Sequence, residues 1–150
     1  MAFVWKSPLV IAPFDFDELV EAIKDGIIPR GQDLTQPWCV LVEPLSLMSD
    51  QLGPQTIPAG FIYNQASLPA AVRWWMSPSD PRICKAACWH DYLSPWGKEP
   101  PPVFDVFGKK ISLNSTGAAE ELYYGMRASG ANWFDAAACS RAVKTFGPKF

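Results

Sequence analysis

The segment ICKAACWHDYLS, from Ile83 to Ser94, decides how the rest of the chain is interpreted. Its apolar residues recur at spacings of three and four, which predicts a helix with one buried face. The single histidine of the chain, His90, stands near the end of this helix and is followed directly by a carboxylate, Asp91. Histidine and aspartate serve in acid–base and metal chemistry, so any chemistry of this chain is expected to involve this dipeptide.

A second unusual segment, IPAGFIYNQASLP from Ile57 to Pro69, lies upstream of the histidine. A strand-like run is followed by a polar turn that contains Asn64 and Ser67, and Pro69 then begins a predicted helix that reaches Met76. A strand that ends in a turn with short polar side chains is a common way to build a site. Asn64 and Ser67 are therefore candidate site residues.

Together with a third segment, these two resemble a phage and prophage family known as the domain of unknown function numbered 1353. The family motif V-P-x-G-F-x-T-D-x-A-S-x-P is matched by residues 57–69, H-D-x-L-Y by His90 to Ser94, and A-D-x-x-F by Ala119 to Tyr123. The resemblance covers residues 38–147, most of the chain. It implies a site that combines His90 and Asp91 with Asn64, Ser67 and Glu120, in which the histidine acts as a base or a metal ligand.

The chain departs from the family pattern at three positions. The threonine and aspartate of the first motif are Tyr63 and Asn64 here, and the aspartate of the third motif is Glu120. An amide is a weaker ligand for a hard cation than a carboxylate and cannot serve as a general base. Two interpretations stay open: the motif residues form a catalytic site, or they form a buried polar network that holds the fold together.

Length and composition exclude several classes of protein. A chain of 150 residues fits a single domain, residues 1–150, with one core. Its net charge of -2 gives no basic surface for nucleic acid, so binding of nucleic acid is not expected. No apolar run approaches the roughly 20 residues of a membrane span, and the first residues lack the order of a signal peptide. We therefore expect synthesis in a host cytoplasm.

The pattern of the whole chain predicts an α+β fold, with a small antiparallel sheet from the N-terminal half packed against helices from the C-terminal half. Caps and stop signals set the expected elements. These are an extended N-terminal arm (1–13), a helix (15–25), strands (38–42, 45–48 and 55–63), a proline-rich loop and hairpin insertion (95–113), a helix capped by Ser115 or Thr116 (118–128), and a last helix from Trp133 to Gly147.

Metal and nucleophile chemistry have weak support in the sequence. The four cysteines have no C-x-x-C spacing, so buried free thiols are predicted, and a zinc site of Cys84, Cys88 and His90 would need the histidine to face the cysteines. Ser67 lacks the G-x-S-x-G elbow of a nucleophile and is better explained as a helix cap. No cofactor is identified, and a metal held by His90, Asp91 and Glu120 depends on the family resemblance.

Seven tryptophans and fifteen prolines suit a protein with extensive contact surfaces, although tryptophans also fill small cores. Together with the resemblance to the phage and prophage family, this composition leads us to expect a non-catalytic, tail-associated structural component of a bacteriophage virion. Its partners would be other virion proteins, and self-association into a homo-oligomer stays open. The alternative is a small, metal-assisted hydrolase of the bacterial cell wall that uses His90, Asp91 and Glu120.

Overall fold

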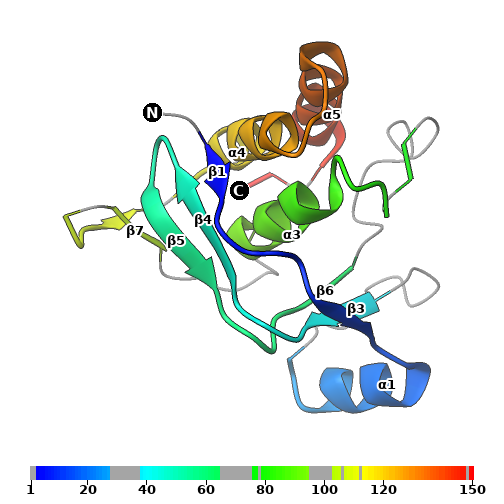
Figure 1. Cartoon of the computed structure of the whole chain (residues 1–150). Coiled ribbons are helices and arrows are strands. Elements are labelled where there is room, and N and C mark those ends of the chain that lie inside the picture. The colour runs from blue at the N-terminus through cyan, green and yellow to red at the C-terminus, as the bar shows by residue number, and fades with distance from the viewer. Residues whose placement is uncertain are drawn as a thin grey trace.

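The computed structural model describes residues 3–27, 38–64, 76–77, 79–94, 103–105, 107–111, 113–147 and 149–150. The elements in order are β1 (Val4–Trp5), β2 (Ile11–Pro13), α1 (Phe16–Lys24), β3 (Trp38–Leu41), β4 (Leu45–Ser49), β5 (Gly53–Ile57), β6 (Ile62–Asn64), α3 (Cys84–Leu93), β7 (Val103–Phe104), β8 (Lys110–Ile111), α4 (Ser115–Ala128) and α5 (Trp133–Phe146). Helices α3, α4 and α5 pack together on one side, and α1 lies at the opposite end (Figure 1). The predicted α+β class is confirmed.

The N-terminal half forms two three-stranded antiparallel sheets rather than one. Their strand orders are β1-β4-β5 and β2-β3-β6. The N-terminal arm contributes an edge strand to each sheet, with Val4 opposite Met48 in the first and Ile11 opposite Leu41 in the second. The arm therefore packs on its own chain and connects the two sheets.

The single strand expected over residues 55–63 is in fact two strands in different sheets. β5 ends at Ile57 and β6 begins at Ile62. Between them, Pro58 lacks the N–H that a ladder needs, and Gly60 has a φ of 90°, in the left-handed region that favours glycine. The Gly60 N–H donates to the carbonyl of Leu41 at 2.7 Å, which directs the chain into the second sheet.

The core consists of three clusters of buried side chains. The largest lies between the strands and α3 and includes Leu45, Ile57 and Trp89, all fully buried. The second joins α3, α4 and α5, and the third packs α1 on Trp38. Helix α3 contributes to the first two clusters, so it is the central element of the fold and the His90 motif lies on it.

Trp5 of the arm is fixed against α4. Its Nε1–H lies 3.1 Å from the carbonyl oxygen of Gly125 and 3.0 Å from Oγ of Ser129. A Cβ at Gly125 would stand 3.0 Å from Cβ of Ala86 on α3 and 3.1 Å from the Trp5 ring. Glycine at this position therefore allows α3, α4 and the arm to approach one another closely.

The predicted helix boundaries are confirmed in most places. Asp15 caps α1, its carboxylate accepting from the N–H of Glu18 at 2.9 Å. The cap of α4 is Asn114 instead of Ser115 or Thr116, because its side chain reaches the N–H of Gly117 at 2.8 Å. The predicted hairpin is present as β7 and β8, while residues 69–75 of the helix predicted to reach Met76 and the segment 95–102 lie outside the described residues. No helix in the described ranges is long and apolar enough to cross a membrane.

Candidate functional site

His90 and Asp91 lie in the last turn of α3. His90 Nδ1 stands 3.8 Å from Asp91 Oδ1, and the two side chains are only 12% and 9% exposed. This separation is within reach of an ion pair but longer than a hydrogen bond. The Ser94 hydroxyl donates to the carbonyl of His90 at 2.8 Å and closes the end of the helix. The dipeptide is therefore a largely buried pair in the last turn of the helix.

β6 places Tyr63 and Asn64 at the edge of the second sheet. Tyr63 is fully buried and pairs with Cys39 of β3, while Asn64 pairs with Trp38. The Tyr63 ring stacks on Phe61 with centroids 5.7 Å apart, and Phe61 meets Tyr92 of α3 edge to face at 5.3 Å. Aromatic contacts thus join β6 to the helix that carries His90.

The interior between β3, β6 and α3 holds neutral polar groups. The Tyr63 hydroxyl has no hydrogen-bond partner among the described residues, and burial raises its pKa. Burial also raises the pKa of Cys39 to about 11 and that of Cys88 well above 9.0. All four cysteines are free thiols, as predicted, and all except Cys84 are buried. Protonated thiols of this kind are poor nucleophiles.

Glu120, the acid chosen from the family motif, lies on the exposed side of α4. Its Oε2 accepts from Gln51 Nε2 at 3.3 Å. The next residue, Glu121, is fully buried, and its Oε1 accepts from the Ser49 hydroxyl at 2.6 Å and from Trp89 Nε1 at 3.2 Å. The acid that meets α3 is therefore Glu121.

The helical period contains the signal that identifies Glu121. Ala118 and Gly125 are small residues that lie three and four positions from it along α4, and both are buried. Residues at these spacings share one helical face. A carboxylate inside such a face is rare unless it is hydrogen-bonded, so its position alone marks a buried polar contact.

Glu121 belongs to a network that crosses the core, which we call the Glu121 network: Glu121, Ser49 and Trp89. Ser49 Oγ also accepts from the N–H groups of Gln51 and Leu52, both at 3.2 Å. Glu121 Oε2 has no partner among the described residues, and burial raises the Glu121 pKa while its two hydrogen bonds oppose that shift. The network fastens the β4–β5 turn to α3 and α4.

The five predicted site residues are only partly brought together. His90 and Asp91 touch, and Asn64 ends the strand that packs on their helix. Glu120 faces outward, and Ser67 lies outside the described residues. Within the described ranges no three His, Cys, Asp or Glu side chains are grouped as a metal site requires, so His90, Asp91 and Glu120 do not form one by themselves.

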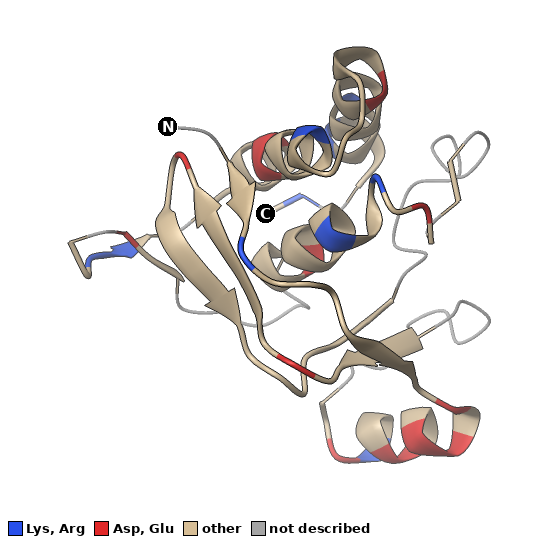
Figure 2. Cartoon of the chain, viewed as in Figure 1, with Lys and Arg blue, Asp and Glu red and all other residues tan. Residues whose placement is uncertain are grey.

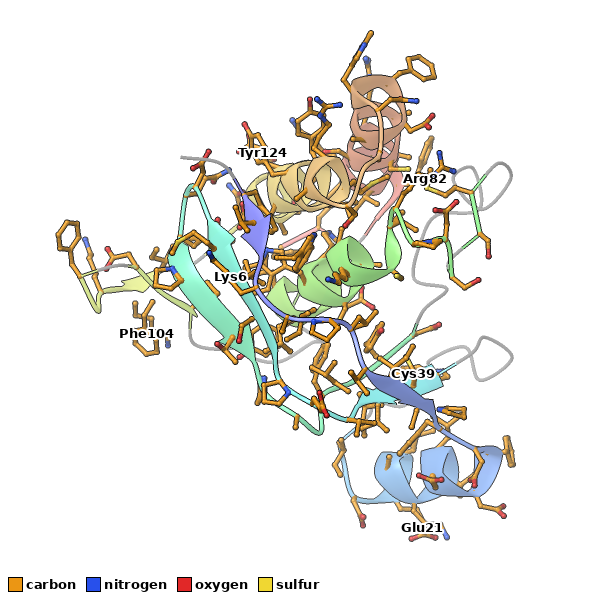
Figure 3. The ribbon with its side chains drawn as sticks, in the orientation of Figure 1. Lys6, Glu21, Cys39, Arg82, Phe104 and Tyr124 are labelled. Carbon is orange, nitrogen blue, oxygen red and sulfur yellow. The ribbon has the colours of Figure 1, made fainter. Side chains whose placement is uncertain are left out.

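Glu120 instead belongs to a groove between α4 and α5 that the sequence did not reveal. This α4–α5 groove has a volume of about 790 Å³, and its lining includes Glu120, Tyr123, Tyr124, Ser140, Arg141 and Lys144. The two tyrosine rings meet edge to face at 5.2 Å, and Tyr124 projects outward from α4 (Figure 3). Tyrosines and charges of both signs suit contact with another protein.

A pair of large aromatic side chains stands exposed at the start of α5. Trp133 and Phe134 are 65% and 63% exposed, and their ring centroids are 6.0 Å apart. Trp133 precedes Ala137, which lines the α4–α5 groove, by one helical turn. The tryptophan therefore extends the groove along the same face of α5. The composition indicates extensive contact surfaces, but it does not tell which aromatic side chains are exposed on the surface.

The fold and the site define a small α+β protein in which helices cover two antiparallel sheets and a His-Asp pair closes the central helix. A model of a family of proteins of unknown function, DUF1353, matches residues 39–143, and the chain belongs to this family. The match confirms the predicted resemblance and includes both α3 and α4. No curated protein and no solved structure matches the chain significantly.

Proposed function

We propose that this protein is a non-catalytic structural component of a bacteriophage virion, associated with the tail, that binds other virion proteins. The exposed pair of Trp133 and Phe134 carries the proposal. Large aromatics that remain in water side by side are unfavourable in an isolated protein and are enriched where proteins meet. The phage and tail assignment itself rests on the family resemblance.

The groove beside this pair supports the same role. Arg141 and Lys144 on α5 and Glu120 on α4 line the groove together with its two tyrosines. Such a surface combines aromatic contact area with charges of both signs, which suits contact with another protein. A partner that covers Trp133 would continue into the groove, since both lie on one face of α5.

The interior also favours a structural role. The Glu121 network links turn, sheet and helices by hydrogen bonds, and the buried thiols of Cys39 and Cys88 stay protonated. Buried polar groups that are hydrogen-bonded in this way specify a fold, and protonated thiols are poor nucleophiles.

Exchange of the exposed pair tests the proposal in the phage. Particles are produced with the variant Trp133→Ser, Phe134→Ser, and the amount of the chain in purified particles is measured by quantitative mass spectrometry. We expect the folded variant to be lost from particles. The control is Phe107→Ser, an aromatic 91% exposed next to the β7–β8 hairpin, which should be incorporated normally. Normal incorporation of the double variant would contradict the proposal.

The contact between His90 and Asp91 favours a second candidate, the cell-wall hydrolase. A histidine 3.8 Å from a carboxylate and 12% exposed can serve as a base if a substrate reaches it. This candidate predicts that His90→Ala keeps the fold but abolishes release of soluble fragments from purified peptidoglycan. If the wild-type protein releases no fragments with or without added divalent metal, the candidate is rejected.

A further inference from the structure

A shallow apolar hollow lies beside α1. Helix α1 lies at the end of the molecule opposite α4 and α5 (Figure 1). Its volume is about 400 Å³, and its apolar lining consists of Phe14, Ala22, Ile27 and Ile62. Ile27 is 57% exposed, so this part of the lining is open to solvent in the single chain. A hollow of this size is large enough to accept an aromatic side chain.

Carboxylates surround the hollow. Asp17, Glu18, Glu21 and Asp25 all contribute to its lining, and Lys24 is the one basic residue within α1. Glu21 projects from the outer side of α1 (Figure 3), and α1 is strongly acidic along its exposed side (Figure 2). An occupant should therefore combine an aromatic group with positive charges.

The C-terminal end of the same chain has this complementary chemistry. Phe146, the last residue of α5, is 70% exposed. Arg141, Lys144 and Lys149 are also exposed, and residues 141–150 contain no acidic residue. We call residues 141–150 the basic end. Phe146 is an exposed aromatic residue surrounded in sequence by basic residues, and the hollow beside α1 is an apolar surface lined by carboxylates. The two surfaces are therefore complementary in both hydrophobicity and charge.

We propose that this protein associates with further copies of itself head to tail, with Phe146 of one copy in the acid-rimmed hollow beside α1 of the next. Lys144 and Lys149 then face the carboxylates of Asp17, Glu18 and Glu21. The hollow and α5 lie at opposite ends of one molecule, so the contact joins two different surfaces (Figure 1). Contacts of this kind produce rings when the rotation between copies closes and filaments when it does not. The self-association does not depend on the virion role.

Sedimentation velocity on the purified chain measures the association directly. We expect oligomers whose size rises with protein concentration and falls at high ionic strength, because salt screens the charges at the rim. The tail variant Lys144→Glu, Phe146→Ser and the hollow variant Glu21→Lys, Ile27→Ser should each weaken association roughly tenfold or more. The exposed control Phe107→Ser should associate as the wild type does.

Mixing the two variants separates a head-to-tail contact from a symmetric one. The hollow variant keeps an intact basic end, and the tail variant keeps an intact hollow, so the mixture should form a dimer of one copy of each and nothing larger. Circular dichroism establishes that both variants are folded, as expected for substitutions at exposed positions. A wild type that is monomeric at every concentration at low ionic strength, or a mixture that remains monomeric, would overturn the proposal.

Discussion

The hydroxyl of Ser49 donates a 2.6 Å hydrogen bond to the buried carboxylate of Glu121. This contact joins the last residue of β4 to the middle of α4 across 72 residues of sequence. The Ser49 hydroxyl also accepts hydrogen bonds from the N–H groups of Gln51 and Leu52 in the following turn. One hydroxyl therefore connects the sheet, the turn and α4. The buried polar side chains of Ser49 and Glu121 thus connect separate elements of the fold.

Ser49→Ala should lower the free energy of unfolding by about 2 to 3 kcal/mol, because it removes a donor from Glu121 and an acceptor from the N–H of Leu52. The matched control is Ser46→Ala in the same strand. Ser46 bonds to Thr56 on the exposed side, so its loss should cost within about 0.5 kcal/mol. Urea denaturation measures the free energy of unfolding of both variants. Equal losses of stability would show that the contact between Ser49 and Glu121 contributes no more than the exposed contact of Ser46.

The stability of the protein should depend on pH through Glu121. Burial raises its folded pKa above the ordinary 4.5, so the folded state binds more protons than the unfolded state between these values. The contribution of Glu121 to the free energy of unfolding therefore falls as pH rises from about 4.5 through the raised pKa. Glu121→Gln removes this component. Denaturation at a series of pH values should show that the variant becomes more stable relative to the wild type as pH rises. If the free energies of unfolding of both proteins depend on pH in the same way, the raised pKa of Glu121 is refuted.

Asp80 should also make the stability of the protein depend on pH, but its contribution should rise with pH, opposite to that of Glu121. The side-chain hydrogen bonds of Arg82 lower the pKa of Asp80 below the ordinary 3.8, with Arg82 Nη2 at 2.8 Å and Nε at 3.0 Å from its oxygens. A lowered pKa gives stability that is present above pH 3.8 and is lost as pH falls through the folded value. Asp80→Asn should therefore flatten the acid end of the stability profile, which acid titration followed by circular dichroism can detect. A variant with the wild-type acid profile would exclude this contribution.

Substitution of Trp5 should lower the free energy of unfolding, whereas substitution of Trp133 should hardly change it. Trp5→Phe removes the donor to Gly125 and Ser129 and should cost about 1 kcal/mol, while Trp5→Ala also loses ring packing and should cost about 3 kcal/mol. Trp133 is 65% exposed, so Trp133→Ala should cost within about 0.5 kcal/mol. Thermal denaturation distinguishes them, and a large loss at Trp133 would mean that it packs on its own chain.

Much of the fold could be predicted because its signals are local. The cap at Asp15 and the stop at Gly147 act within one helical turn of their own position, so the sequence contains all that is needed to place them. The break between β5 and β6 is different. Pro58 and Gly60 are visible in the sequence, but the partner of Tyr63 is Cys39, and such distant pairing depends on how both sheets pack.

The site was harder to predict for the same reason. The family motif directed attention to Glu120, whereas the packing of α4 on α3 selects Glu121 as the buried acid. The side chains of His90 and Asp91 lie 3.8 Å apart, a contact between residues adjacent in the sequence. The α4–α5 groove could not be predicted, because it exists only where two helices meet.

The copy number of this chain in purified phage particles tests the central claim most directly. Quantitative mass spectrometry of gradient-purified particles should find it at a fixed ratio to known tail proteins, because a structural component occupies defined positions. A chain that is abundant in the infected-cell lysate but absent from the particles would contradict the structural role and would return attention to the His90–Asp91 pair.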